Sequence, residues 1–213
     1  MAIFKEINCD HCGRKTGPLT RTKLSDGKHL CSKCTGPIPG SLKRKDYGGF
    51  LREWEAVEES KNVLSKQFTP THTFHAIEID TDHELIKLDW QPIIFKFENV
   101  SSFDMWFDPQ EVKNGVFNPK VTGDIHAKIK FDLPEFFYES KIASNVKTKA
   151  RKESGLFRDK AVYESPKGMD EFIMHFRRAW RAALDRKIAW DLVEAERLLE
   201  ETNRLLSPDE DED

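Results

Sequence analysis

The sequence predicts an α+β protein with four parts in order along the chain: a small cysteine-rich finger, a connecting helix, an antiparallel β-domain and a long C-terminal helix. Three observations predict this fold class. All the cysteines lie near the start, short alternating strand-like runs fill the middle, and a helical apolar stripe runs toward the C-terminus. The expected boundaries are 1–40 for the finger, 41–68 for the connecting helix, 69–206 for the β-domain with its long helix, and 207–213 for an acidic, disordered tail.

The finger is predicted from two Cys-x-x-Cys pairs, Cys9 with Cys12 and Cys31 with Cys34, which hold all the cysteines of the chain. Eighteen residues separate the pairs, a spacing typical of a structural zinc site. Zinc takes four ligands in a tetrahedron, and four thiolates fill that shell. We therefore predict that these four cysteines bind one Zn²⁺.

Other uses of the cysteines are weaker. Two disulfides require an oxidising compartment, yet the N-terminal residues lack the pattern of a secretory signal, so we expect a cytoplasmic protein. A thioredoxin-like redox pair explains one Cys-x-x-Cys but not two, and an iron–sulfur cluster remains an alternative. His11 and His29 could each replace a thiolate, but four cysteines suffice, so both are interpreted as surface residues or neighbours of the site.

The residues between the two pairs predict a β-hairpin. Asp26-Gly27 separates two short strand-like runs, which is a strong hairpin signal. Knuckle, hairpin and knuckle together predict a zinc ribbon or treble-clef finger. Gly13 and Gly36 follow the two pairs and would tolerate positive φ at their turns. Because the finger holds little apolar material, the metal must supply about 10 kcal/mol of its folding free energy.

A connecting helix is predicted from Phe50 to about Gln67. Phe50, Trp54, Val57 and Leu64 follow one another at steps of four, three and seven, which places them on one helical face. That apolar stripe is expected to dock on a neighbouring element.

The middle of the chain predicts an antiparallel sheet or barrel, because short alternating runs recur between polar turns. The segment 144–160 is basic and poor in large apolar residues, and it is expected to form an exposed loop or an edge hairpin. The strand-like runs cover 73–79, 84–90, 93–97, 102–107 and 123–132.

The last element is predicted as a helix from about Lys167 to Leu206, with apolar residues at steps of three and four. It is too long for a small β-domain to cover. Its first half is expected to cap the β-domain, and its second half to pair with the connecting helix. A second copy of the chain, giving a homo-oligomer through this helix, is the alternative. The apolar residues of the second half are Ile188, Trp190, Leu192, Val193, Leu198 and Leu199.

Charge is unevenly distributed. Residues 1–45 carry ten Lys/Arg against three Asp/Glu, a formal +7, within a chain whose net charge is −3. A basic finger suggests nucleic-acid binding. However, no aromatic residue is interleaved in the hairpin for base stacking, which favours solubility and neutralisation of a thiolate site instead. The candidate nucleic-acid contacts are Arg21, Lys23, Lys28, Lys147, Lys149, Arg151 and Lys152.

No catalytic motif stands out, and we expect no enzymatic activity. His72, His75 and His83 could form a second metal site or a general base, but surface histidines explain them better. Asp80, Asp82 and Glu84 are interpreted as an acidic turn. Trp106, Trp180 and Trp190 are interpreted as packing residues rather than as a stacking platform.

The order of parts resembles a group of proteins from Gram-positive bacteria and their phages and other mobile elements. In that group a small zinc-ribbon-type domain of unknown function often precedes a bacterial PH-like β-domain. The two Cys-x-x-Cys pairs with Asp26-Gly27 carry the first resemblance, and the segments 74–80 and 98–104 carry the second. The resemblance implies a PH-like half-barrel capped by a C-terminal helix and a binding or adaptor role, and it implies no catalytic residues. The longer helix and the basic 144–160 segment depart from the group.

Three functions remain open at this point. The leading one is a cytoplasmic zinc-binding adaptor that presents surfaces to a protein partner. The second is a nucleic-acid-binding protein that uses the basic finger and the 144–160 segment. The third is an enzyme whose site lies in the β-domain. No apolar run approaches the ~20 residues that a membrane-spanning helix needs.

Overall fold

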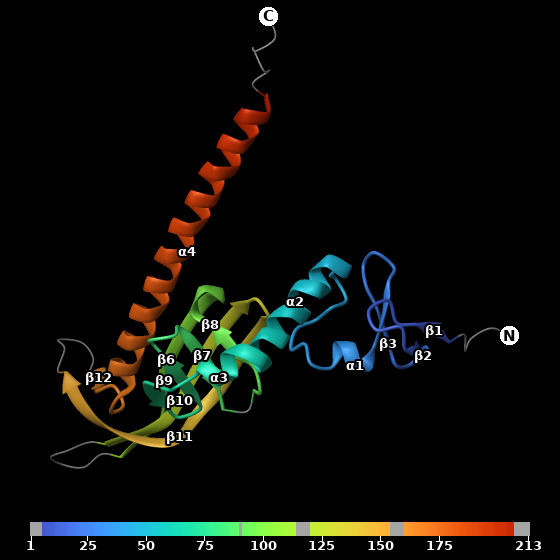
Figure 1. The fold of residues 1–213 in the computed structure, drawn as a ribbon. Coiled ribbons are helices and arrows are strands. Elements are labelled where there is room, and N and C mark those ends of the chain that lie inside the picture. The colour runs from blue at the N-terminus through green and yellow to red at the C-terminus, as the bar shows by residue number, and fades with distance from the viewer. Residues whose placement is uncertain (1–5, 90, 114–119, 154–159, 207–213) are drawn as a thin grey trace, which may run out of the picture.

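The computed structural model describes residues 6–89, 91–113, 120–153 and 160–206 (Figure 1). Within these ranges the chain is mixed α+β, with antiparallel sheets, a long C-terminal helix and a cluster of four cysteines. This confirms the coarse fold class. The predicted acidic tail, residues 207–213, lies outside the described residues. No helix in the described part of the chain combines the length and apolarity needed to cross a membrane.

The finger contains two small hairpins and one short helix. Strand β3 (Arg21–Lys23) pairs with β4 (His29–Cys31) around the predicted Asp26-Gly27 turn, where Gly27 has a φ of +87°. A second pairing, β1 (Ile7–Asn8) with β2 (Lys15–Thr16), encloses the first cysteine pair. The sequence did not indicate it, because two-residue strands carry no readable alternation. Helix α1 (Ser32–Thr35) follows β4 directly.

The two glycines near the cysteine pairs serve different purposes. Gly13 has a φ of +71°, as predicted. The prediction for Gly36 is wrong, because its φ is −60°. Gly36 instead closes α1 by donating its N–H to the Ser32 carbonyl, and a Cβ at this position would lie only 2.9 Å from that oxygen. Close approach, not left-handed backbone, explains this glycine.

The connecting helix begins earlier than predicted. It comprises α2 (Tyr47–Glu59), a π-helical turn η1 (Ser60–Leu64) and α3 (Ser65–Gln67). Asp46 caps the start by accepting the Gly49 N–H at 2.7 Å. Ser60, in the π turn, is fully buried and its hydroxyl accepts the Ile94 N–H at 2.7 Å.

The first sheet contains four antiparallel strands in the order β5-β6-β7-β8. The predicted single run 73–79 is wrong, because the chain reverses at His75, which has a φ of +51°. His-Ala is not a usual turn dipeptide, so this tight hairpin could not be predicted from the sequence. The strands are β5 (His72–Phe74), β6 (Ile77–Asp80), β7 (Leu85–Leu88) and β8 (Ile94–Lys96).

The second sheet has the order β12-β11-β10-β9, and its strands are much longer than predicted. The described part of the basic segment 144–160 lies in the hairpin of β11 and β12, which confirms the edge-hairpin expectation; Arg158 lies outside the described residues. A 3₁₀ turn η2 (Phe97–Asn99) joins the two sheets. The strands are β9 (Val100–Lys113), β10 (Lys120–Asp132), β11 (Glu135–Glu153) and β12 (Lys160–Tyr163).

The first half of helix α4 (Met169–Leu206) covers the β-domain, as predicted. Phe172 stacks on Phe74 of the first sheet, and Phe176 stacks on Phe103 of the second. The Trp180 indole N–H donates to the Val100 carbonyl at 2.9 Å. The helix therefore joins both sheets in one core, which also includes buried residues of the finger and of α2.

The second half of α4 does not pair with the connecting helix, so that prediction is wrong. Figure 1 shows the end of α4 running away from α2, and its apolar residues are exposed. The stripe of α2 is already used, since Phe50 and Val57 are buried in the main core. The apolar stripe of α2 was therefore not left for α4 to cover.

Candidate metal centre

The four cysteine sulfurs converge on one point. All four Sγ atoms lie within 4.8 Å of one another, close enough to hold a metal ion. Cys9 Sγ lies 3.9 Å from Cys34 Sγ, and Cys31 Sγ lies 3.6 Å from both Cys12 Sγ and Cys34 Sγ. A disulfide has sulfurs about 2.05 Å apart, so these cysteines are free thiols.

The backbone brings the two pairs together. Cys9 and Cys12 lie on the loop between β1 and β2, while Cys31 ends β4 and Cys34 lies in α1. Asp10 tightens this arrangement, because its N–H donates to the His29 carbonyl and its carboxylate accepts the His29 N–H at 2.6 Å. The first knuckle is thereby fixed against the hairpin that leads into the second.

The surroundings of the sulfurs shift the pKa values of Cys9, Cys31 and Cys34 in different directions. Burial opposes the thiolate of Cys31, yet hydrogen bonds from the Cys34 backbone and the neighbouring thiols lower its pKa to about 6. Burial likewise opposes the charge on Cys9, but backbone N–H groups, including that of Cys31 at 3.3 Å, lower its pKa. Burial and the neighbouring thiols raise the pKa of Cys34. A bound cation would let all four thiols ionise together.

The histidines of the finger lie outside this cluster. His11 is half-buried, and its ring packs edge-on to Phe50 at 5.1 Å and against Trp54 at 5.0 Å. His29 contributes its backbone to the Asp10 bonds. The interpretation of His11 and His29 as neighbours rather than ligands agrees with this geometry. His11 instead docks the finger on helix α2.

A charged cluster that the sequence did not indicate fixes α2 to the β-domain. Lys45 Nζ lies 2.6 Å from Glu53 Oε1 and 2.7 Å from Glu135 Oε2. The buried Glu53 also accepts the Glu135 N–H at 2.8 Å. Burial opposes the charge on Lys45, but the two carboxylates raise its pKa. The three residues are far apart in sequence, so no motif could have revealed them.

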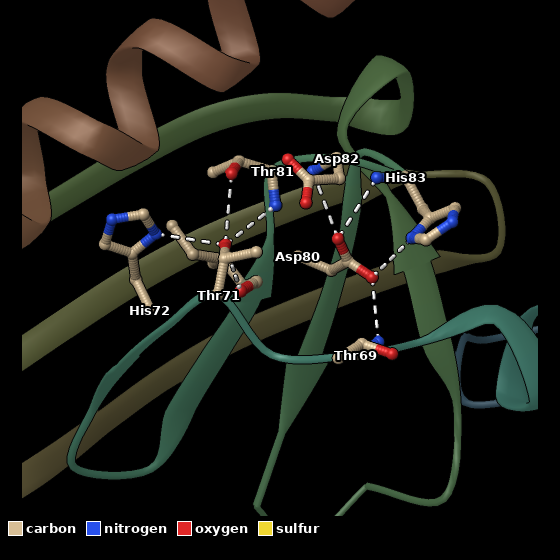
Figure 2. Close-up of polar contacts among 8 residues, drawn as sticks. Thr69, Thr71, His72, Asp80, Thr81, Asp82 and His83 are labelled. Carbon is tan, nitrogen blue, oxygen red and sulfur yellow. Dashed lines mark hydrogen bonds and ion pairs between the residues drawn. The ribbon is translucent and has the colours of Figure 1, made fainter.

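The acidic turn after β6 is a structural element. Asp80 is fully buried, and its carboxylate accepts four hydrogen bonds, from the N–H groups of Thr69, Asp82 and His83 and from the His83 ring (Figure 2). Burial opposes its charge, but these donors lower its pKa. Glu84 forms an ion pair with Arg186 of α4. These partners account for the carboxylates of Asp80 and Glu84 without a ligand, while Asp82 contributes its backbone N–H.

The three histidines near this turn do not form a common site. His83 binds Asp80, whereas His72 lies on the other side of Thr71 in Figure 2 and stacks on His175 of α4 at 3.9 Å. His75 is exposed at the hairpin tip. In the described part of the chain no trio of these side chains converges as the cysteines do.

The candidate nucleic-acid residues do not form one patch. Arg21, Lys23 and Lys28 lie on the finger, whereas Lys147 and Lys149 lie on the distal part of β11, at the opposite side of the molecule (Figure 1). Lys28 Nζ is also placed over the Tyr47 ring at 3.9 Å. The side chains of Arg151 and Lys152 are outside the described set.

Two of the three tryptophans interpreted as packing residues are exposed. Trp180 is half-buried and packs as predicted. Trp106 lies on the outer face of β9 against His126, and Trp190 is 70% exposed on α4. The sequence failed here because a strand alternation or helical stripe does not reveal which face has a neighbour.

Comparison of the chain with protein-family models, curated proteins and solved structures gives no match. The site is therefore interpreted from its own geometry.

Proposed function

We propose that this chain is a zinc-binding, non-enzymatic interaction module of adaptor type, with one Zn²⁺ held by Cys9, Cys12, Cys31 and Cys34. One observation carries the proposal. A tetrahedron with Zn–S bonds of about 2.3 Å has sulfur–sulfur edges of about 3.8 Å. Three of the sulfur pairs are 3.6, 3.6 and 3.9 Å apart, and all four sulfurs lie within 4.8 Å of one another.

The donor set supports a structural role for the metal. Four protein thiolates leave no open position for water or substrate, which is the arrangement of structural rather than catalytic zinc. Such a site needs a compartment that keeps thiols reduced, in accord with the expected cytoplasmic location. The knuckle, hairpin and short helix that carry the ligands fit the zinc-ribbon or treble-clef expectation.

The contacts of the finger support an adaptor role. His11 packs on α2, and Lys45 links α2 to the β-domain through Glu53 and Glu135. A metal that holds the finger therefore also holds the relative placement of two surfaces. Two antiparallel sheets followed by a helix fit the PH-like half-barrel suggested by the resemblance to Gram-positive and phage proteins.

Metal analysis tests the proposal. Protein purified without added metal should contain one zinc per chain by elemental analysis, and Cys12→Ser should release it. Ser32→Ala, an exposed change between the second pair of cysteines, is the matched control and should retain zinc. Protein with no zinc, or with iron and visible absorbance, contradicts the proposal.

Nucleic-acid binding is the second candidate, and one structural observation favours it. The outer face of the second sheet exposes Trp106 and Phe137, with Lys128 Nζ 5.1 Å from the Phe137 ring and His126 stacked on Trp106. Exposed aromatic rings among cations can stack on bases. Asp104 and Glu139 on the same face oppose it by repelling phosphate.

Fluorescence anisotropy with a labelled single-stranded oligonucleotide at ~50 mM salt separates the two candidates, since phosphate contacts are strongest at low salt. The adaptor proposal expects no binding. Binding that is lost in Trp106→Ala and Phe137→Ala but retained in the solvent-facing control Leu19→Ala would favour the second candidate.

A further inference from the structure

Helix α4 leaves the β-domain halfway along its length (Figure 1). Its first half is anchored by buried side chains, and Lys187 Nζ donates to the Glu98 carbonyl at 3.3 Å. From Ile188 to Thr202 every side chain is exposed except the half-buried Glu194. The residues buried in the first half are Met169, Phe172, Phe176, Ala179 and Ala183.

The free half carries an apolar seam. Ile188, Leu192, Ala195 and Leu199 follow at steps of four, three and four, which is the spacing of a coiled-coil interface. The leucines and the isoleucine are 57–64% exposed. A contiguous exposed apolar strip marks a surface that another chain covers.

The two halves of α4 have opposite charge. Residues 177–187 contain five Arg/Lys and one acidic residue, whereas residues 188–206 contain five Asp/Glu and two Arg. Arg181 lies on the face of the seam, one heptad before Ile188, and Asp191 and Glu196 flank the seam in the second half. Within the described residues, none of the following exposed side chains forms an ion pair: Arg177, Arg178, Arg181, Asp191, Glu196 and Glu200.

We propose that a second copy of this chain covers the seam, with the two α4 helices antiparallel. In that arrangement the basic half of each helix lies beside the acidic half of the other, and the same contacts form twice about a two-fold axis. A parallel pair would instead place acidic beside acidic and basic beside basic, and like charges repel across such an interface. Charge therefore selects both the partner and its direction.

The antiparallel arrangement also gives ion-pair partners to the exposed arginines in the first half of α4. They point away from the core of their own domain, and an antiparallel neighbour brings Glu196 and Glu200 toward Arg178 and Arg181. The apolar centre of the interface then consists of Ile188 and Leu192 from both copies. This interface is independent of the metal site and of the proposed adaptor role.

Sedimentation velocity on the full zinc-loaded chain tests the proposal. A dimer should form, and it should weaken between ~50 mM and ~500 mM salt because exposed charges are screened. The triple variant Arg177→Glu/Arg178→Glu/Arg181→Glu should weaken dimerisation at least about tenfold, since each lost pair counts twice. Lys120→Glu/Lys147→Glu/Lys149→Glu, on the second sheet, is the charge-matched control and should leave the dimer intact.

Exchanging the charges of the two halves of α4 is the decisive part of the experiment. Asp191→Lys/Glu196→Lys/Glu200→Lys alone should also weaken the dimer, and combining it with the arginine triple should restore it. Truncation after Lys187 should give a monomer. A full chain that stays monomeric overturns the proposal. A dimer that resists both triple variants, or that the combined variant fails to restore, overturns the antiparallel arrangement.

Discussion

At the scale of single residues, Asp80 shows how one buried carboxylate can join several parts of the backbone. It ends β6 and binds the chain on both sides, at Thr69 before the sheet and at His83 in the next turn. Figure 2 shows these donors converging on one buried carboxylate. A buried charge is tolerated only when hydrogen bonds replace its water.

Asp80→Ala should therefore destabilise the β-domain by about 2–3 kcal/mol, because several donors lose a charged acceptor at a buried site. The measurement is the free energy of unfolding from urea titration. Asp82→Ala is the matched control, since Asp82 is exposed and contributes its backbone N–H to Asp80. Equal losses for both variants would contradict this assignment.

The pH dependence of stability follows from the lowered pKa of Asp80. Because the folded pKa lies below the unfolded value of about 3.9, the stabilisation is complete above that value and declines as the pH falls through the folded pKa. The stability difference between the native chain and Asp80→Asn should shrink over this range. Comparing the two chains cancels the effect of metal release by acid, and a difference independent of pH would exclude the mechanism.

At the scale of single residues, the sequence predicted only those residues whose function follows from their spacing along the chain. Cys9 and Cys12 were identifiable because one tight turn must bring both sulfurs to a common point. Glu53 and Glu135 were not, since the contact with Lys45 depends on how a helix meets a distant strand turn. Long-range contacts of this kind leave no local pattern.

At the scale of elements, the connecting helix is the part that joins finger and β-domain. Glu53→Ala should destabilise the protein by about 2–3 kcal/mol, less than the loss for a fully buried ion pair because Lys45 remains partly exposed. Thermal unfolding of the zinc-loaded chain measures it. Glu55→Ala, an exposed change on the same helix, should alter stability by less than about 0.5 kcal/mol. A comparable loss for Glu55→Ala would show that the loss in Glu53→Ala does not come from the ion pair.

Helices were predictable from the sequence because a 3.6-residue stripe persists over many turns, as in α4. The hairpin of β5 and β6 was not, because its turn at His75 lacks the Gly, Asn or Asp that normally marks such a reversal. The destination of the α4 stripe was also beyond the sequence. Periodicity shows that the apolar stripe of α4 needs a partner. Only the structure shows that the stripe of α2 is already buried in the core and cannot be that partner.

At the scale of the whole molecule, the finger and the β-domain share one core, and the proposed zinc would stabilise the finger more than the β-domain. Removing zinc with a chelator should expose the finger to hydrogen exchange while β10 and β11 stay protected, because the long central strands bury many apolar residues without the metal. Hydrogen-exchange mass spectrometry of chelated and zinc-loaded protein makes the comparison.

After zinc removal, helix α2 should lose less protection from hydrogen exchange than the finger and more than β10 and β11. Its Phe50 packs on His11 of the finger, while Val57 lies in the main core. Partial loss of protection at the start of α2 is therefore expected in the chelated protein. Collapse of protection throughout β10 and β11 would mean that the finger is required for the fold of the whole chain.

The π turn at Ser60 bears on how the protein behaves at high concentration. Strand β8 ends its sheet, and the open edge of a sheet can recruit a strand from a neighbouring molecule. Here Ser60, at the start of the π turn, occupies the Ile94 N–H with its hydroxyl. The connecting helix thereby removes one donor of this edge strand from pairing with another molecule, which should lower the tendency of the protein to aggregate through β8.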